Sequence, residues 1–422
     1  MKKFLIQDCG IYLNLANDLA AKGKNLVRYY TDYGSAFPSY REYATGDGPD
    51  KGGKTWGFED IVKCDDFFDF IEESDCIGTF DCSKNDLIAY LRKLYPEKSI
   101  FGAGWMARLE DDRLMFKRFL EKAGLPVIPY TVVKGFDALR KYLKENPNKV
   151  VKTNIFRKDF ESLVCKDYES VKQLLTNREP AFGPYADEMK FIVEDFVESV
   201  VEAGFDGFYT PDSGFQHFSY GIEFDKNFYL GRVGGELPAV LKKTLDVIDP
   251  YFAKKDYRGL ISTEERIVSQ DLAYFIDPCL RGAMPLGVLF GKYIKNWPEV
   301  MYQVGLNQPF DIECDHKYVA AMSLTTPNST EFFTRIKFEE GHRDDFRLMM
   351  ACQDKQGGYY SVKGLEAVVV ACAAGDTPEE AVERLKATGE WVDAYGLEND
   401  ELKSIDIDET IKKAATVGII FD

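Results

Sequence analysis

The sequence predicts an α/β (α+β) protein of several domains. Strand and helix signals alternate over the first hundred residues, aromatic β-segments dominate the middle third, and the composition changes again after Gly305. Alternating strands and helices are typical of a largely parallel sheet covered by helices, whereas neighbouring strands indicate mixed or antiparallel sheets. The chain has 422 residues, and single cores rarely grow beyond about 250 residues. We therefore expect two to four domains.

The first domain, residues 1–103, is expected to be a small doubly wound, Rossmann-like unit. The apolar spacing predicts strands at 4–6, 26–30, 76–80 and 99–101, and helices at 11–22 and 86–94. Ligands of such a sheet bind at the carboxyl ends of its strands, which here lie near Asp8, Gly34 and Asp81. No GxGxxG motif follows the first strand, so a dinucleotide site has no support.

The second domain, residues 104–304, begins with a linker helix expected over residues 109–124. Glu110, Asp111 and Asp112 near its start favour the helix dipole, and Gly124 is well placed to end it. Further segments are expected as strands at 130–133, 149–152, 191–197, 207–209 and 216–224, with a helix at 137–145.

The third domain, residues 305–422, is expected to be a small α+β unit. Strands are predicted at 333–338 and 365–370. A helix should begin after Thr377, which is a suitable N-cap, with Pro378 in the first turn and Glu380 completing a capping box.

Composition restricts the class of partner and the compartment. The formal charge of −17 argues against broad nucleic-acid binding, which needs clustered Lys and Arg. No apolar run reaches the roughly 18 residues of a membrane span, and Met1–Asp8 resembles a first strand more than a signal peptide. The nine cysteines form no CxxC pair and the three histidines are far apart, so we expect reduced thiols in the cytoplasm and little support for a zinc site.

Two acidic residues in neighbouring β-segments form the most informative pattern. Glu264 and Asp277 lie thirteen residues apart, so a hairpin could bring both carboxylates to one rim, with Arg281 close behind. Magnesium prefers oxygen ligands and usually takes one or two carboxylates together with substrate phosphates. The pattern therefore indicates a site for magnesium and a nucleotide's phosphates. The alternative, charged residues on an exposed strand, stays open at this point.

Two cations could bind phosphate. Lys152 ends an apolar strand and could meet a phosphate as a compact point charge, although a solvated lysine fits the pattern too. Arg113 lies in the first turn of its expected helix, where the dipole slightly disfavours a cation. That small cost hints at a role, although surface exposure also explains it.

A strand exit with flanking acids could bind a nucleoside. Glu194 and Glu202 could accept from an exocyclic amine or from ribose hydroxyls, and the backbone around Phe196 could read an adenine edge. A strand with flanking charges is the simpler interpretation of the same residues.

The order of these pieces resembles the ATP-grasp superfamily and, within it, the phosphoribosylamine–glycine ligase family. That order runs from an α/β amino-terminal domain through a charged linker helix, a strand ending in Lys152 and a Glu194-x-Phe196 hinge to a terminal Asp277-x-x-x-Arg281 strand. The resemblance covers nearly the whole chain and includes residues 363–381 near its carboxyl end. It implies an ATP-grasp fold with a Rossmann-like amino-terminal domain and a small α+β carboxyl-terminal domain.

The resemblance also implies roles for individual residues and two cofactors, ATP and Mg²⁺. Arg113 and Lys152 would bind phosphates, Glu194 and the backbone of Phe196 the adenine, and Glu202 the ribose. Glu264 and Asp277 would ligate magnesium. Arg281, with Lys152, would act in catalysis by steadying the transferred phosphate.

Several residues depart from the family pattern. The loop after Lys152 contains no glycine, so Arg157 or Lys158 would cover the phosphates in place of backbone amides. Cys279 stands where the family usually has a ligand asparagine, and cysteine is a poor magnesium ligand. Residues 7–10 replace the glycine cluster of the purine enzyme.

The implied activity is ATP-dependent ligation of a carboxylate to an amine through an acyl phosphate. The resemblance suggests glycine and phosphoribosylamine, as in purine biosynthesis. Residues 225–238, with glycines at 231, 234 and 235, are expected as a loop at the substrate, where Lys226 or Arg232 would bind a phosphate or carboxylate; a mobile surface loop is the alternative. Because the departures cluster on substrate-facing parts, a different amine is an alternative, such as a modified nucleotide or nucleobase of the kind found in phage DNA. A nucleotide-binding protein without catalysis and a bicarbonate-dependent carboxylase subunit are further alternatives. We expect a monomer or homodimer with small-molecule partners and no membrane contact; nucleic acid would enter only as a modified-base substrate.

Overall fold

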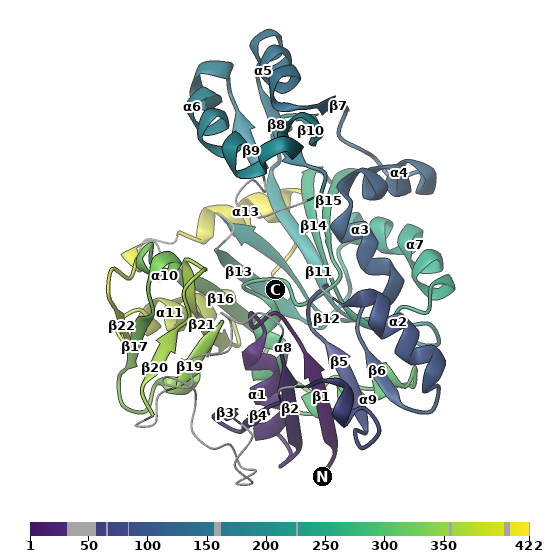
Figure 1. The fold of residues 1–422 in the computed structure, drawn as a ribbon, viewed down its shortest axis with the longest axis vertical. Coiled ribbons are helices and arrows are strands. Elements are labelled where there is room, and N and C mark those ends of the chain that lie inside the picture. The colour runs from purple at the N-terminus through teal and green to yellow at the C-terminus, as the bar shows by residue number, and fades with distance from the viewer. Residues whose placement is uncertain are drawn as a thin grey trace.

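The computed structural model describes residues 1–31, 56–64, 66–82, 84–155, 162–224, 227–353, 357–400 and 406–421. These residues form four sheets: two of four strands, one of six and one of eight. Figure 1 shows the first sheet at the bottom, a separate lobe at the top, the eight-stranded sheet between them, and a small sheet at the left. The predicted mixed α/β class is confirmed.

The amino-terminal sheet has the strand order β3-β4-β2-β1-β5-β6. Its strands are β1 (Lys3–Gln7), β2 (Leu26–Tyr30), β3 (Trp56–Phe58), β4 (Ile61–Lys63), β5 (Cys76–Thr79) and β6 (Ser99–Phe101). The helices of this part are α1 (Leu13–Ala21), α2 (Asn85–Leu94) and the short η1 (Phe68–Phe70) and η2 (Gly104–Ala107). β1 pairs in parallel with both β2 and β5, as expected for a doubly wound sheet.

The adjacent ends of β1 and β5 bring two acids together. Asp8, Cys9 and Asp81 can each place a ligand atom within 4.8 Å of the others. Burial, and then the Asp81 carboxylate, raise the pKa of Asp8 well above its usual value. The Asp8 carboxyl group therefore binds a proton more readily in the folded protein than a solvent-exposed aspartic acid does. Gly34, the third residue expected at this edge, lies outside the described residues.

The linker helix expected over residues 109–124 is two helices. α3 (Arg108–Asp111) ends where Asp112 adopts an extended conformation, and α4 (Arg113–Ala123) begins directly after it. The Asp112 carboxylate accepts a hydrogen bond from the Met115 amide at 2.9 Å, which makes Asp112 an N-cap. The single-helix prediction was therefore wrong at Asp112, whereas Gly124 ends α4 in the left-handed conformation as expected.

The upper lobe in Figure 1 has its own sheet and core. Its strand order is β7-β10-β8-β9, with β7 (Tyr130–Lys134), β8 (Lys149–Thr153), β9 (Ser162–Cys165) and β10 (Lys190–Asp195). Helices α5 (Phe136–Glu145), α6 (Tyr168–Arg178) and η3 (Glu179–Asp187) cover one face. A separate buried cluster, which includes Phe136, Leu139 and Phe191, holds this lobe together.

The central sheet has the order β15-β14-β11-β12-β13-β16-β21-β18. Its strands are β11 (Val201–Thr210), β12 (Gly214–Phe224), β13 (Phe228–Val233), β14 (Gly259–Ser269), β15 (Leu272–Cys279), β16 (Tyr318–Thr325), β18 (Phe346–Leu348) and β21 (Ala367–Gly375). β13 pairs with β16, so one sheet contains strands from both sides of the domain boundary expected near residue 305. The three-domain division stays a prediction.

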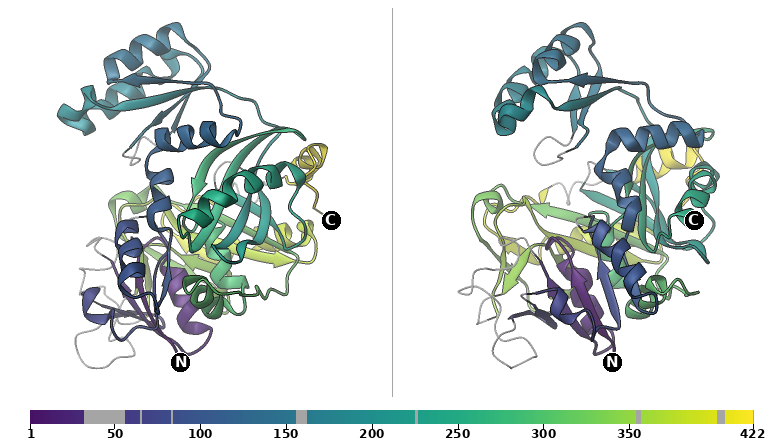
Figure 2. Two further views of the ribbon diagram at one scale, coloured as in Figure 1. Left: turned by 90° about the vertical axis from the view of Figure 1, so that its right-hand side faces the viewer. Right: turned by 45° about the vertical axis from the view of Figure 1, so that its right-hand side comes forward.

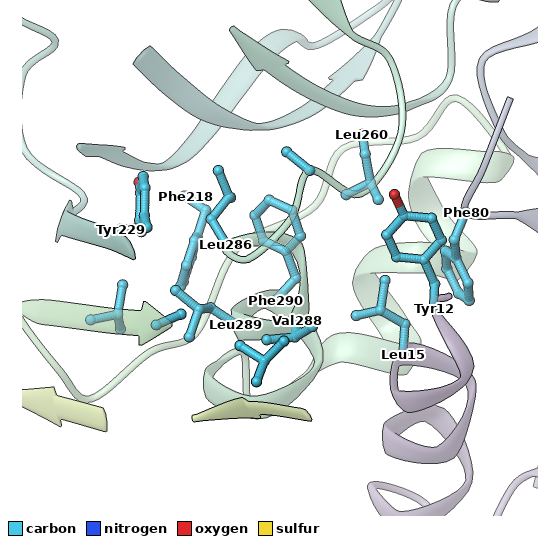
Figure 3. Close-up of a cluster of buried hydrophobic side chains, with 14 of the residues drawn as sticks. Tyr12, Leu15, Phe80, Phe218, Tyr229, Leu260, Leu286, Val288, Leu289 and Phe290 are labelled. Carbon is cyan, nitrogen blue, oxygen red and sulfur yellow. The ribbon is translucent and has the colours of Figure 1, made fainter. Parts of the chain in front are cut away.

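The helices α8 (Gly287–Tyr293) and α9 (Trp297–Gly305) pack between the central sheet and the amino-terminal part, whereas α7 (Ala239–Lys254) packs against β11, β12 and β15 of the central sheet. Figure 3 shows Leu289 and Phe290 of α8 between the aromatic side chains of the central sheet and those of α1, where Tyr12 and Leu15 lie. This shared core fixes α1 against the sheet that carries the acid hairpin.

The carboxyl-terminal segment forms a small sheet and returns to the central one. The small sheet has the order β19-β20-β17-β22, from β17 (Thr334–Phe338), β19 (Ala351–Gln353), β20 (Tyr359–Ser361) and β22 (Val392–Ala394). Its neighbours are α10 (Asn328–Glu331), η4 (Arg343–Asp345) and α11 (Pro378–Thr388), and the chain then forms α13 (Asp408–Thr416). Thr377 caps α11, as the sequence predicts.

The tail after α13 is anchored in the central sheet. The Tyr220 hydroxyl donates to the Ile420 carbonyl at 2.8 Å, and the Phe421 ring packs near the rings of Tyr220 and Tyr318. Figure 1 shows α13, in yellow, above β13 and below the upper lobe. In Figure 2 the same helix again lies beside the central sheet.

No helix in the described ranges is long and apolar enough to cross a membrane. All nine cysteines are free thiols.

A buried carboxyl group lies inside the central sheet. Asp206 of β11 is 1 % exposed and accepts hydrogen bonds from Ser262 Oγ at 2.5 Å and the Tyr229 hydroxyl at 2.6 Å. Burial raises its pKa to about 7, although both hydrogen bonds oppose the shift. The folded protein therefore keeps a proton on Asp206 that the unfolded chain releases near pH 4. The stabilisation that comes from protonated Asp206 falls as the pH rises from about 4 to 7, and it is lost above pH 7.

We expect Asp206→Asn to remove this pH dependence. One pKa unit corresponds to about 1.4 kcal/mol, so the variant should gain roughly 2 kcal/mol of stability relative to the wild type between pH 5 and pH 7. Urea unfolding curves at the two pH values measure the difference. Asp212→Asn, at an exposed acid, is the control and should show a constant difference. A constant difference for Asp206→Asn would show that Asp206 does not titrate in this range.

Candidate active site

A cavity of about 600 Å³ lies where the upper lobe, the central sheet and α13 meet. Small-molecule sites typically have volumes of roughly 300–1,000 Å³. Residues from β8, β9 and β10 line one side, residues from β11, β12, β14 and β15 line the other, and α13 contributes two more. The charged residues in this lining are Arg113, Lys152, Glu194, Asp195, Glu202, Glu223, Glu264, Arg266, Asp277, Arg281 and Lys413.

The acid hairpin forms as the sequence predicts. β14 and β15 are antiparallel, and Glu264 lies directly opposite Asp277 in their register. Both carboxylates line the cavity, and Cys279 lines it with them. Two hard oxygen donors side by side fit a magnesium ion, whereas the thiol at 279 does not. The hairpin therefore offers an oxygen donor set for magnesium without a ligand at position 279.

Lys152 lies at the centre of the charged groups. Its side chain is 9 % exposed, and Nζ lies 3.6 Å from Asp277 Oδ2 and 3.7 Å from Glu194 Oε2. Burial by itself lowers the pKa of Lys152, but the carboxylates of Asp277 and Glu194 outweigh it and raise the pKa above its usual value. The amine is therefore charged at neutral pH, at a place where a phosphate could approach it.

Arg113 comes from the start of α4 and reaches the same acid. Its Nε lies 3.8 Å from Asp277 Oδ1, and its Nη1 donates to the Thr153 carbonyl at 3.1 Å. The distances to Asp277 from Arg113 and Lys152 exceed those of direct hydrogen bonds. The Arg113–Asp277 and Lys152–Asp277 contacts are therefore charge–charge contacts without a short hydrogen bond.

Glu194 is held by a lysine that the sequence analysis did not identify. Lys117 Nζ lies 2.6 Å from Glu194 Oε1, and both side chains are almost completely buried. Burial lowers the pKa of Lys117, although the attraction of Glu194 opposes the shift. Glu194 thus lies between Lys117 and Lys152, so its carboxylate fixes two amines in addition to any contact with a nucleoside.

Arg281 lies just beyond the end of β15. Its Nε donates to Glu110 Oε1 at 2.6 Å, and its Nη1 donates to the Tyr12 hydroxyl at 2.6 Å. Arg281 also lines the cavity. Three distant segments of the chain, α3, the start of α1 and the end of the acid hairpin, therefore meet at this arginine.

Two acids face each other on β11 and β12. Glu202 lies opposite Glu223 in the register, and Glu202 Oε1 accepts from Arg266 Nη2 at 2.6 Å. Burial, and then the charge of Glu264, raise the pKa of Glu223 well above its usual value. All four side chains line the cavity, so its central-sheet side is strongly acidic.

Phe196 and Arg232 do not lie where their predicted roles would require. Phe196 is 44 % exposed, and its amide donates to the Asn148 carbonyl at 3.1 Å, so this amide is already occupied in the structure. Its neighbours Asp195 and Val197 line the cavity, whereas Phe196 itself is not among the lining residues. Arg232 was expected in a substrate loop but lies within β13, with its guanidinium over the Tyr318 ring and outside the cavity lining.

Three other candidates, Arg157, Lys158 and Lys226, lie outside the described residues. Their roles over the phosphates and at the substrate stay predictions.

The residues that sequence reasoning missed come from the linker and from the carboxyl-terminal helix. In the linker, Glu110 and Lys117 were missed, whereas Arg113 was predicted. All three are buried, and they contact the opposite charges of Arg281, Glu194 and Asp277, respectively. Their i, i+3, i+7 spacing among apolar residues was a usable signal, because charged residues are rarely buried unless they are paired. Thr410 and Lys413 of α13 also line the cavity, and no comparable pattern marked them.

Comparisons with solved structures identify the architecture. No protein-family model matches the chain, and no curated protein matches it in sequence. The fold is similar to phosphoribosylamine–glycine ligase from Thermotoga maritima, with a TM-score of 0.67 and 16 % identity over 94 % of this chain and 98 % of that one. It is also similar to the biotin carboxylase domain of Hydrogenobacter thermophilus 2-oxoglutarate carboxylase, with a TM-score of 0.68 and 12 % identity over 99 % and 98 % of the two chains.

A third similar structure is N5-carboxyaminoimidazole ribonucleotide synthetase from Thermotoga maritima. Its TM-score is 0.61 and its identity 13 %, over 93 % of this chain and 99 % of that one. These proteins share one architecture, and the similarity extends over almost the full length of the present chain. The chain therefore has the ATP-grasp fold.

Proposed function

We propose that the protein is an ATP-dependent ligase that joins a carboxylate to an amine and releases ADP and phosphate. One observation carries this proposal. Lys152, Arg113 and Arg281 converge with the Glu264–Asp277 hairpin on a single cavity between two sheets. Phosphoryl transfer requires positioned cations and charge neutralisation more than a nucleophilic side chain.

The proposed reaction has two steps. The carboxylate of the first substrate attacks the γ-phosphorus of ATP, the bond to the bridging oxygen of ADP breaks, and an acyl phosphate forms. The amine nitrogen of the second substrate then attacks the acyl carbon; the C–N bond forms, the bond to phosphate oxygen breaks, and the nitrogen loses a proton to solvent. Lys152 and Arg113 would bind the phosphates during the first step, and Arg281 would stabilise the acyl phosphate.

Glu264 and Asp277 would hold the magnesium that accompanies ATP. Bound there, Mg²⁺ supplies a positive charge that neutralises the phosphate oxygens during transfer. Support comes from the paired oxygen donors in register and from the three basic side chains around them. Glu202 would hold the ribose, and Glu194 and the hinge after β10 would bind the adenine.

For the substrates, glycine and phosphoribosylamine are the first candidates, as in purine biosynthesis. Support comes from the similarity to phosphoribosylamine–glycine ligase and from the motif order. A different amine, such as a modified nucleotide or nucleobase of the kind found in phage DNA, is the second candidate. The acid pair Asp8 and Asp81 at the strand ends of the amino-terminal sheet favours the nucleobase, which carries no phosphate, because a glycine-rich loop there would suit an anionic substrate better.

A coupled assay for ADP release tests the proposal. Purified protein with MgATP is screened against glycine and other amino acids, each combined with a panel of amines. The expected result is ADP release that requires one acid and one amine, with the amide identified by mass spectrometry. Asp277→Asn should abolish turnover because it removes a charged magnesium donor.

Three outcomes separate the alternatives. ATP binding without turnover across the panel would favour a non-catalytic nucleotide-binding protein and reject the ligase. ADP release that depends on bicarbonate in place of an amino acid would favour a carboxylase subunit. Full activity of Asp277→Asn would refute the metal role of this residue.

A further inference from the structure

Glu110 is a buried carboxylate with three hydrogen-bond donors around it. It lies in α3 and is 3 % exposed. Its Oε1 accepts from Arg281 Nε at 2.6 Å, and its Oε2 accepts from the Leu280 amide at 2.9 Å and from the Cys82 thiol at 3.0 Å. A buried carboxylate is costly unless it is paired and hydrogen-bonded, and Glu110 meets both conditions. The donors come from the loop after β15 and from the segment after β5.

The same contacts determine which part of Arg281 can meet a ligand. Nε is bound to Glu110, and Nη1 donates to the Tyr12 hydroxyl at 2.6 Å and to the Gly282 carbonyl at 3.1 Å. Of the hydrogen bonds between described residues, none uses Nη2. Because Arg281 lines the cavity, Nη2 is the donor left for a bound anion.

A planar guanidinium held at two nitrogens has little rotational freedom. Rotation about Cδ–Nε would break the bond to Glu110 or the bond to Tyr12, both of which are short and one of which is charge-assisted. The Leu280 amide bonded to the same carboxylate also fixes the backbone next to Arg281. Side chain and backbone of the arginine are thus held by one acid.

We propose that Glu110 is a positioning residue, which holds Arg281 so that its Nη2 points at the acyl phosphate. This role rests on the proposed function, because it assigns Glu110 to the arginine that would stabilise the transferred phosphate. Glu110 does not itself line the cavity, so it acts through Arg281. Tyr12, from the start of α1, completes the clamp from the amino-terminal sheet.

The first test follows the arginine directly and needs no turnover. The protein is labelled with ¹⁵N-arginine, and the Nε–H signal of Arg281 is identified by its loss in Arg281→Lys. In the wild type, the short bond to Glu110 should give a downfield signal that exchanges slowly with water. Glu110→Gln should shift this signal upfield and speed its exchange, because the charge on the acceptor is lost. Glu121→Gln, the same substitution at an exposed residue of α4, is the matched control and should leave the signal unchanged.

The second test uses ADP release with the substrates found by the screen. Glu110→Gln should lower kcat roughly 10²-fold, since misplacement of a catalytic group by about 1 Å has an effect of this size. The Kd of a non-hydrolysable ATP analogue should change less than about threefold, because the loss is confined to the reaction step. A merely structural role would weaken nucleotide binding and kcat together, or neither.

Glu110→Asp covers the case in which Glu110→Gln does not fold. It keeps the charge but is one methylene shorter, so it cannot reach Arg281 and the Leu280 amide at once. We expect a reduced kcat with an intact thermal unfolding transition. An unchanged Nε–H signal and an unchanged kcat in either folded variant would overturn the proposal. If the wild type shows no turnover, the ligase function fails, and the Nε–H comparison still decides whether Glu110 positions Arg281.

Discussion

Lys152→Met is expected to stop ADP release and to weaken ATP binding about 10- to 100-fold, since a charge-assisted hydrogen bond contributes about 1.5–3 kcal/mol. Methionine preserves the length and the buried packing of the side chain but removes its charge. The cause of the loss is local, because Nζ lies within 4 Å of both Asp277 and Glu194 in the cavity. Calorimetric titration with a non-hydrolysable ATP analogue measures the affinity.

Lys149→Met is the matched control for this variant. Lys149 lies on the same strand and pairs with Asp195, but its side chain does not line the cavity. Its substitution should leave the affinity for the analogue unchanged. Wild-type affinity and turnover in Lys152→Met would mean that this lysine does not bind the phosphates.

Arg281→Lys should lower kcat about 10²- to 10³-fold, which is the usual effect of removing one donor that stabilises a developing charge. Lysine keeps the positive charge but has no fork, so it cannot bind Glu110, Tyr12 and a phosphate together. The affinity for ATP should change little, because Lys152 and Arg113 remain in the cavity to bind the phosphates. Steady-state ADP release and titration of the analogue, measured in parallel, separate the two effects.

Arg140→Lys is the matched control for Arg281→Lys. Arg140 lies on α5 of the upper lobe and pairs with Asp137 and Glu179. Its replacement should leave kcat unchanged. If Arg281→Lys also retains the wild-type kcat, the fork of Arg281 has no part in the reaction.

The acid hairpin could be predicted because its information is local. Glu264 and Asp277 belong to adjacent strands joined by a short turn, and the strand period then determines which side chains share a face. The alternative of surface charges was removed only by the structure, which places both residues in the cavity lining. The fold class, the amino-terminal sheet and most strands of the upper lobe were predictable for the same reason.

The linker shows where local information was insufficient. Glu110, next to a predicted helix start, was interpreted as favouring the helix dipole, but it is buried and bonded to Arg281. Their separation in sequence is too large for any periodicity to relate them. The break at Asp112 was also missed, because an aspartate within an apolar pattern can either continue a helix or cap a new one.

Arg232 was misplaced for a different reason. Glycines at 231, 234 and 235 suggested a loop, yet Arg232 lies in a strand that bridges β12 and β16. Gly231 is required there because a Cβ would lie 2.6 Å from the Tyr229 ring. Pairing of β13 with β12 and β16 thus determined the conformation here, and not the local preference of the glycines for a turn.

The anchored tail has a consequence for the order in which the protein is assembled. Lys413 and Thr410 belong to the cavity, and the tail at Ile420 and Phe421 holds their helix against Tyr220 of β12. During synthesis the amino-terminal sheet and the upper lobe can form early, because their strands are contiguous in the chain. The lining of the cavity cannot be complete until residues 410–421 have been made. A nascent chain therefore exposes an open, acidic half-site until translation reaches its carboxyl-terminal helix.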